Sequence, residues 1–307
     1  MYTISEELYQ TLAKEIKVLK KERKAVILAH YYQRPEIQDI ADFVGDSLQL
    51  SQQAAKTDAE VIVFCGVHFM AESASILSPD KVVILPEAGA GCPMADMVDA
   101  GSLRAYKKEA PGVKVVCYVN SSAEVKAESD ICCTSSNVIK VIQSLEGQDI
   151  LFIPDANLGR YAGRILGQTL RLWPGYCETH HQLTKEDILA ARKEHPFAKV
   201  IVHPECQEEV SLEADYVGST AELIAYAQNS AHREFIVGTE SGILHRLHQV
   251  CPDKKIHLAA ERMVCSNMKL TTLTKVRDAL IALSPQITVR EEIRVRAQKA
   301  LERMLSL

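Results

Sequence analysis

The pattern of apolar and polar positions repeats three times along the chain. Each copy begins with an apolar run of three or four residues, as expected for a buried parallel strand, and then turns polar. The copies align without a gap and cover residues 27–47, 115–135 and 200–220. Such self-similarity indicates a repeated structural unit. The sequence therefore predicts three copies of one α/β module.

The polar positions of the three copies align in columns. Four of these columns are His30, Tyr118 and His203; Tyr32, Asn120 and Glu205; Asp42, Asp130 and Asp215; and Ser47, Ser135 and Thr220. The last column precedes an apolar run with helical spacing, so its hydroxyls are expected at or near helix starts. An N-cap role is the simpler interpretation of one such hydroxyl. The threefold recurrence favours anion binding, because the free N–H groups of a helix start attract anions.

The length of the chain suits three modules better than one, because 307 residues exceed the usual size of a single domain. We expect α/β/α, Rossmann-like modules at residues 1–111, 112–190 and 191–287, the first with an N-terminal helix. Residues 288–307 are amphipathic and are expected to form a helix that packs back on the first module. No low-complexity linker separates the modules, so we expect them to pack with pseudo-threefold symmetry around a central cavity.

Parallel α/β sheets bind ligands beyond the carboxyl ends of their strands. The first two columns come directly after an apolar run, and the fourth column closes each copy. If the strand ends face inward, the side chains of these columns converge on the central cavity. The sequence thus predicts a polar site for a small molecule.

Charge and composition exclude several classes of partner. The net charge is -5 and no block of Lys or Arg is present, which argues against nucleic acid or an anionic membrane as the main partner. The longest apolar runs have strand length, so no membrane span is expected. The first residues lack the pattern of a signal peptide, and we expect a cytoplasmic protein. Its nine cysteines are then expected as free thiols or metal ligands.

Three cysteines follow the repeats at similar distances, and each lies in a predicted loop. These are Cys92, Cys177 and Cys265. Their spacing matches no local zinc or ferredoxin motif, so their threefold recurrence is what indicates a shared metal site. Zinc is one candidate. The other is a [4Fe-4S] cluster with one iron not bound by protein, which could act as a Lewis acid that helps water to leave.

Many short motifs of the chain resemble, in order, the motif series of the quinolinate synthase family. They include AHYYQ, GDS, GCPM, YVN, CTS, GYCETH, HPE, GST and CSNMK, and the resemblance covers nearly the whole chain. It implies a cytoplasmic enzyme of NAD biosynthesis, with three α/β domains around a cavity that holds a [4Fe-4S] cluster. The implied reaction condenses iminoaspartate (iminosuccinate) with dihydroxyacetone phosphate to give quinolinate, phosphate and water. The cluster would act as the Lewis acid for dehydration.

The resemblance also implies which residues form the site. The implied cluster ligands are Cys92, Cys177 and Cys265, and the implied substrate contacts are His30, Ser47, Tyr118, Asn120, Ser135, His203, Glu205 and Thr220. We expect catalysis from Glu205, Tyr32 and His203. Glu205 is the first choice as general acid or base, because a carboxylate in a cavity can have its pKa raised toward neutrality. His180 and His181, beside Cys177, are expected to support the metal site or the structure rather than to bind the metal.

Several points stay open at this stage. The sequence does not decide whether five further residues that follow predicted strands take part in the site: His68, Asp155, Asn157, Thr239 and Glu240. Transient contact with an enzyme that supplies iminoaspartate is also left open. A zinc-dependent lyase or hydrolase on the same modules is one rival interpretation. An iron-sulfur sensor is the other, but a sensor needs an output element such as a basic DNA-reading helix, and none is visible.

Overall fold

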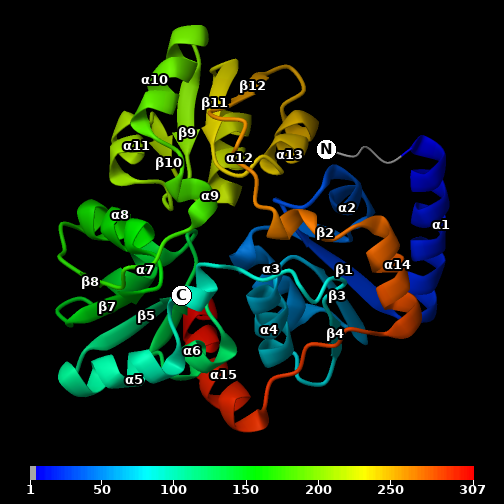
Figure 1. Cartoon of the computed structure of the whole chain (residues 1–307), viewed down its shortest axis with the longest axis horizontal. Coiled ribbons are helices and arrows are strands. Elements are labelled where there is room, and N and C mark those ends of the chain that lie inside the picture. The colour runs from blue at the N-terminus through cyan, green and yellow to red at the C-terminus, as the bar shows by residue number, and fades with distance from the viewer. Residues whose placement is uncertain (1–4) are drawn as a thin grey trace. The chain divides into compact units, whose positions relative to one another are not determined.

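A computed structural model describes residues 5–307 and contains three parallel sheets of four strands each (Figure 1). The strand order is β2-β1-β3-β4 in the first sheet, β6-β5-β7-β8 in the second and β10-β9-β11-β12 in the third. All neighbouring strands run parallel. The same order therefore occurs three times, which confirms the prediction of three similar α/β modules. In residues 5–307 no helix combines the length and apolar character needed to cross a bilayer.

The first module forms around strands β1 (Ala25–His30), β2 (Phe43–Gly45), β3 (Val61–Cys65) and β4 (Val82–Ile84). Its helices are α1 (Glu6–Glu22), α2 (Pro35–Ile40), α3 (Ser47–Lys56), α4 (His68–Leu77) and α14 (Leu273–Ala282). Helix α1 begins where the Ser5 side chain accepts a hydrogen bond from the N–H of Leu8.

The second module has strands β5 (Lys114–Tyr118), β6 (Ile131–Cys133), β7 (Ile150–Ile153) and β8 (Arg171–Leu172). Its helices are α5 (Ala100–Glu109), α6 (Ala123–Ala127), α7 (Val138–Gln143), α8 (Ala156–Leu166) and α9 (Glu178–His181). The third module has strands β9 (Lys199–Val202), β10 (Tyr216–Val217), β11 (Glu234–Gly238) and β12 (Lys255–Leu258). Its helices are α10 (Lys185–Glu194), α11 (Glu208–Glu213), α12 (Thr220–Asn229) and α13 (Ile243–Val250), and the last helix of the chain is α15 (Glu291–Leu305).

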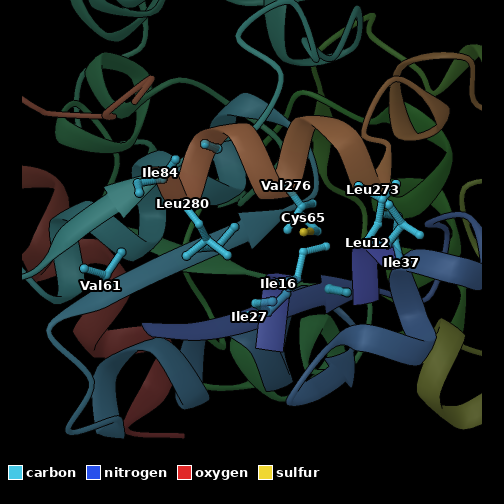
Figure 2. Packing of buried hydrophobic residues seen from close by; sticks show 13 residues of the cluster. Leu12, Ile16, Ile27, Ile37, Val61, Cys65, Ile84, Leu273, Val276 and Leu280 are labelled. Carbon is cyan, nitrogen blue, oxygen red and sulfur yellow. The ribbon is translucent and has the colours of Figure 1, made fainter. Parts of the chain in front are cut away.

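The chain divides into two compact units. The first unit consists of Met1–Cys92 and Ser266–Glu291, and the second of Pro93–Cys265 and Glu292–Leu307. The second unit holds both the second and the third sheet. In the first unit, Figure 2 shows Ile16 of α1, Ile27 of the sheet, and Val276 and Leu280 of α14 within one hydrophobic cluster. Truncation of one such core side chain to alanine costs about 2–5 kcal/mol.

Two expected boundaries need correction. Residues 266–287 were expected in the third module, but they belong to the first unit, where α14 lies beside α1 (Figure 1). The last helix was expected on the first module, but it packs on the second. Arg296 of α15 donates to Glu128 at 3.0 Å, and Arg303 donates to the backbone oxygen of Asp130 at 2.5 Å. The amphipathic pattern predicts the apolar face of a helix but not which module covers it.

The aspartate column has a structural role in all three modules. Asp42 accepts a hydrogen bond from the backbone N–H of Ile27 at 2.8 Å, and Asp130 accepts one from Val115 at 2.9 Å. Asp215 accepts the equivalent bond from Val200 at 2.9 Å. Each bond joins the start of the second strand to the start of the first. These three carboxylates therefore lie at the amino ends of the strands, away from the ends where ligands bind.

Candidate functional site

The first polar column lies at the carboxyl ends of the first strand in each module. His30 is the last residue of β1, Tyr118 is the last residue of β5, and His203 directly follows β9. In each sheet the chain continues to a strand on one side and then to a strand on the other, so these residues lie at the topological switch point. The predicted position is thus confirmed within each module. That the residues of the first unit meet those of the second stays a prediction.

The first and second columns are joined by a repeated hydrogen bond. The backbone N–H of Tyr32 donates to Nδ1 of His30 at 3.1 Å, and the N–H of Glu205 donates to Nδ1 of His203 at 3.3 Å. A backbone N–H can only donate, so we infer that Nδ1 is the acceptor and that Nε2 carries the proton of the neutral ring. In the second unit Nε2 of His203 lies 3.2 Å from the hydroxyl oxygen of Ser135. The repeat therefore orients an imidazole N–H donor.

Glu205 is buried among three ring side chains. Its Oε2 lies 2.6 Å from Nδ1 of His180 and 3.5 Å from Nδ1 of His203, and only 3 % of the residue is exposed. Burial raises its pKa, but His180 and His203, which attract the carboxylate when they are protonated, and the hydrogen bonds of His180 and Tyr118 outweigh burial and lower the pKa to about 2. The expected rise of this pKa is therefore wrong. Glu205 is an ionised carboxylate near neutral pH.

A raised pKa is found instead at the side chain of Asp155, which follows β7 and Pro154. Asp155 is fully buried, and its burial together with the charge of Glu205 raises its pKa well above the usual range. Its Oδ1 accepts hydrogen bonds from the N–H groups of Asn157 and Leu158, and so caps α8. Asn157 in turn donates to the backbone oxygen of Glu205 at 3.1 Å. Asp155 and Glu205 are thus neighbours with opposite pKa shifts.

His180 links the cysteine loop of the second module to Glu205. Its Nδ1 lies 3.2 Å from Sγ of Cys177, and its Nε2 lies 2.8 Å from the hydroxyl of Thr239. The loop itself is held by Gly175, whose N–H donates to the oxygen of Pro154 at 3.1 Å. A Cβ at Gly175 would lie 2.5 Å from that oxygen, so only glycine fits this close approach. His180 is more than a packing residue, because it contacts both a thiol and a carboxylate.

The turn after β11 also positions the cysteine loop of the third module. Oε1 of Glu240 accepts a hydrogen bond from the N–H of Cys265 at 3.1 Å, and its Oε2 accepts one from Gly242 at 2.7 Å. Glu240 is fully buried. Thr239 and Glu240 therefore position the loops of Cys177 and Cys265. Sequence reasoning left both residues undecided, and the signal that could have selected them is their place directly after a buried strand.

The three predicted metal ligands are the accessible thiols of the protein. Cys92, Cys177 and Cys265 are half-buried, whereas the other six cysteines are fully buried. Cys92 belongs to the first unit, and the other two belong to the second. Reactive and metal-binding thiols need such access, whereas buried thiols are inert. The accessibility of each of the three thiols therefore fits a metal ligand.

Three buried side-chain oxygens of the second unit have no hydrogen-bond partner among the described residues. They are Oε1 of Glu205, Oδ1 of Asn120 and Oδ2 of Asp155. Buried polar atoms are normally paired, and an orphaned acceptor marks where a donor on a ligand can bind. A cleft of 410 Å³ in the same unit is lined by Asn157, Arg160, His181, Glu208 and Glu209, among others. Its lining therefore carries groups of both charge types.

The hydroxyls of the fourth column do not serve as N-caps. Ser47 and Thr220 are the first residues of α3 and α12, and the caps are the side chains of Asp46 and Ser219. Ser135 precedes α7, whose N-cap residue is Asn137. The simpler interpretation of the column is therefore wrong. Ser47 and Thr220 lie where the N–H groups of a ten-residue helix begin, as anion binding requires.

Comparison with known proteins gives one consistent result. The family model described as "Quinolinate synthetase A protein" matches residues 14–306. A relative from Desulforudis audaxviator, named quinolinate synthase, is 59% identical over 297 residues, which cover 96% of this chain and 98% of the relative. A quinolinate synthase from Methanosarcina barkeri is 54% identical over 296 residues, or 96% of this chain and 97% of the relative. A quinolinate synthase from Geobacter sp. strain M21 is 54% identical over 298 residues, which cover 97% of this chain and 98% of the relative.

Proposed function

Since the chain belongs to the quinolinate synthase family, we propose that it condenses iminoaspartate with dihydroxyacetone phosphate to give quinolinate, phosphate and water. One observation supports this most strongly. The ionised Glu205 lies between two imidazoles at the carboxyl ends of the strands, and His180 joins it to the thiol of Cys177. A polar site with an accessible thiol beside it suits an enzyme whose substrates are small and anionic.

Cys92, Cys177 and Cys265 would hold the [4Fe-4S] cluster. Their shared accessibility among otherwise buried cysteines supports this set. When bound, the cluster supplies an iron not ligated by protein, which is a Lewis acid suited to the loss of water. Thr239 and Glu240 hold the loops of two of these ligands through His180 and the N–H of Cys265.

The substrate carboxylates and phosphate would bind to N–H and O–H donors of the polar columns. His30 and His203 offer Nε2–H groups, because Nδ1 of each ring accepts a backbone hydrogen bond. Ser47, Ser135 and Thr220 offer hydroxyls, two of them at helix starts. Tyr118 and Asn120 complete the proposed contacts, and the orphaned Oδ1 of Asn120 can accept a hydrogen bond from a substrate amine or hydroxyl.

Proton transfer would rest on His203 together with Glu205. A carboxylate with a pKa of about 2 is a weak base, so Glu205 is better suited to stabilise positive charge on an imidazole than to take a proton from carbon. Glu205 would stabilise His203 in its protonated form, and the protonated ring could then give its Nε2 proton to a leaving hydroxyl and return to the neutral state. Tyr32 stays the second candidate for proton transfer in the first unit.

The partners follow from this reaction. Iminoaspartate and dihydroxyacetone phosphate are the proposed small-molecule substrates. An imine is hydrolysed in water, which is the chemical reason for transient contact with the enzyme that supplies it. That contact and a cytoplasmic location stay predictions.

The direct test is product formation by anaerobically purified protein. Iminoaspartate generated in the assay and dihydroxyacetone phosphate should give quinolinate and phosphate in equal amounts, measured by chromatography and a phosphate assay. Omission of either substrate should abolish both products. Protein with its full content of iron and sulfide that forms no quinolinate would contradict the proposal.

A further inference from the structure

Three side chains of types that can bind a metal ion lie together in the third module, at a place that the proposed reaction does not use. His195 follows α10, Glu234 is the first residue of β11, and His257 lies within β12. Thr239, which contacts His180 of the proposed site, follows the other end of β11. Five strand residues at about 3.3 Å each place Glu234 roughly 16 Å from Thr239. The group at the amino end is therefore separate from the site described above.

The distances within this group fit one metal ion. Nε2 of His257 lies 3.0 Å from Oε1 of Glu234, and Nδ1 of His195 lies 3.5 Å from the same oxygen. All three ligand atoms lie within 4.8 Å of one another. A tetrahedral zinc ion with bonds of about 2.0–2.1 Å holds its ligand atoms about 3.3 Å apart. The two imidazole–carboxylate distances bracket that value.

The elements around the group hold it in place and leave it accessible. Strands β11 and β12 pair in parallel, with Ile236 opposite His257, and the N–H of His195 donates to the oxygen of Ala191 at the end of α10. The side chains of His195, Glu234 and His257 are 28 %, 22 % and 28 % exposed. A hydrated ion can reach them, and a water can fill the fourth position.

We propose that His195, Glu234 and His257 bind one divalent transition-metal ion, with Zn²⁺ as the best match. Two imidazoles and one carboxylate are a known ligand set for zinc, and the carboxylate offsets half of the charge of the ion. The two rings are stacked, with centroids 3.5 Å apart and planes at 14°. Binding would splay the rings so that both lone pairs point at the ion. The ion would connect the end of α10 to two strands of the third sheet.

The test measures zinc binding to the cluster-bearing protein, whose ligand cysteines are occupied. Anaerobic protein is dialysed against buffered micromolar Zn²⁺, and zinc per chain is determined by elemental analysis. We compare the wild type with His257→Gln, Glu234→Gln and the matched control His232→Gln, an exposed histidine outside the group. One zinc per chain is expected in the wild type and the control, with affinity at least about tenfold weaker in the other two variants.

Two further measurements distinguish a variant that has lost a metal-binding side chain from a variant that has misfolded. Zn²⁺ should raise the melting temperature of the wild type and of His232→Gln but not of the other two variants, because only binding to the folded state stabilises it. X-ray absorption at the zinc edge should show nitrogen and oxygen ligands only. Equal zinc affinity in the wild type and His257→Gln, or sulfur ligands around the zinc, would overturn the proposal. Neither result depends on whether the protein makes quinolinate.

Discussion

Two groups of histidine and glutamate lie at opposite ends of the third sheet, and they differ mainly in burial. At the carboxyl end, His180 and Glu205 lie 2.6 Å apart with side chains only 2 % and 4 % exposed. At the amino end, His257 and Glu234 lie 3.0 Å apart with side chains 28 % and 22 % exposed. Charges interact strongly where water is excluded and weakly where it is present. The same residue types are therefore proposed to support catalysis at one end and a surface metal site at the other.

The largest difference between the two ends is expected in turnover. Glu205→Gln removes the charge that stabilises the imidazoles and should lower kcat by about 10²–10⁴, with iron and sulfide retained. Glu234→Gln makes the same chemical change at the amino end and should leave kcat within about twofold. Steady-state kinetics and metal analysis of both variants provide the measurement. Loss of the cluster in Glu205→Gln would refute a catalytic role of Glu205. An equal loss of kcat in both variants would show that the two ends of the sheet do not differ in their contribution to turnover.

A smaller effect is expected at Thr239, which positions His180 without a proposed contact to substrate. Thr239→Val removes the hydroxyl 2.8 Å from Nε2 of His180 and should lower kcat about tenfold, the equivalent of about 1.4 kcal/mol. KM should change little, because the substrate contacts remain. Thr239→Ser keeps the hydroxyl and should recover most of the activity. No recovery in Thr239→Ser would indicate that the methyl group, and hence packing, is what matters.

The smallest effect is expected on stability at the amino end. Asp215→Ala removes the acceptor for the N–H of Val200 and should lower the free energy of unfolding by about 1 kcal/mol, with kcat within about twofold. Burial raises the pKa of Asp215, but hydrogen bonds from Lys199 and Val200 and the charge of Arg192 lower it overall. Because the pKa is lowered in the folded state, this stabilisation is present above the unfolded-state pKa of about 3.9 and is lost as the pH falls below it.

Urea unfolding of the wild type and Asp215→Ala at pH 7 and near pH 3 measures this contribution. The difference between the two proteins should shrink at the lower pH. If kcat of Asp215→Ala falls together with its stability, the amino end of the third sheet affects the proposed active site at the carboxyl end.

The repeat made much of the fold and site predictable. The column that contains His30 and His203 lies at strand ends because one α/β unit is repeated three times, and the gapless alignment predicts that repeat without any structure. The aspartate column is equally regular but structural, since Asp42, Asp130 and Asp215 bind the first strand of each module. Recurrence therefore identifies a repeated position, and only its place on the strand separates a ligand contact from a structural bond.

What the repeat could not predict depends on single residues that have no counterpart in the other modules. The sign of the pKa shift of Glu205 depends largely on His180, which belongs to α9 of the second module and lies outside every column. The raised pKa of Asp155 depends in turn on burial and on the charge of Glu205. The position of α15 depends on Arg296 and Arg303 meeting Glu128 and Asp130, and an amphipathic pattern does not specify such pairs.

The central claim is that Cys92, Cys177 and Cys265 hold one cluster. The most direct measurement is iron and acid-labile sulfide per chain after anaerobic purification, for the wild type and a serine variant of each cysteine. Cys251→Ser serves as the control at a buried thiol. We predict about four iron and four sulfide atoms in the wild type and the control, and their loss in all three ligand variants. Zinc in place of iron, or a cluster that survives any one of the three substitutions, would contradict the claim.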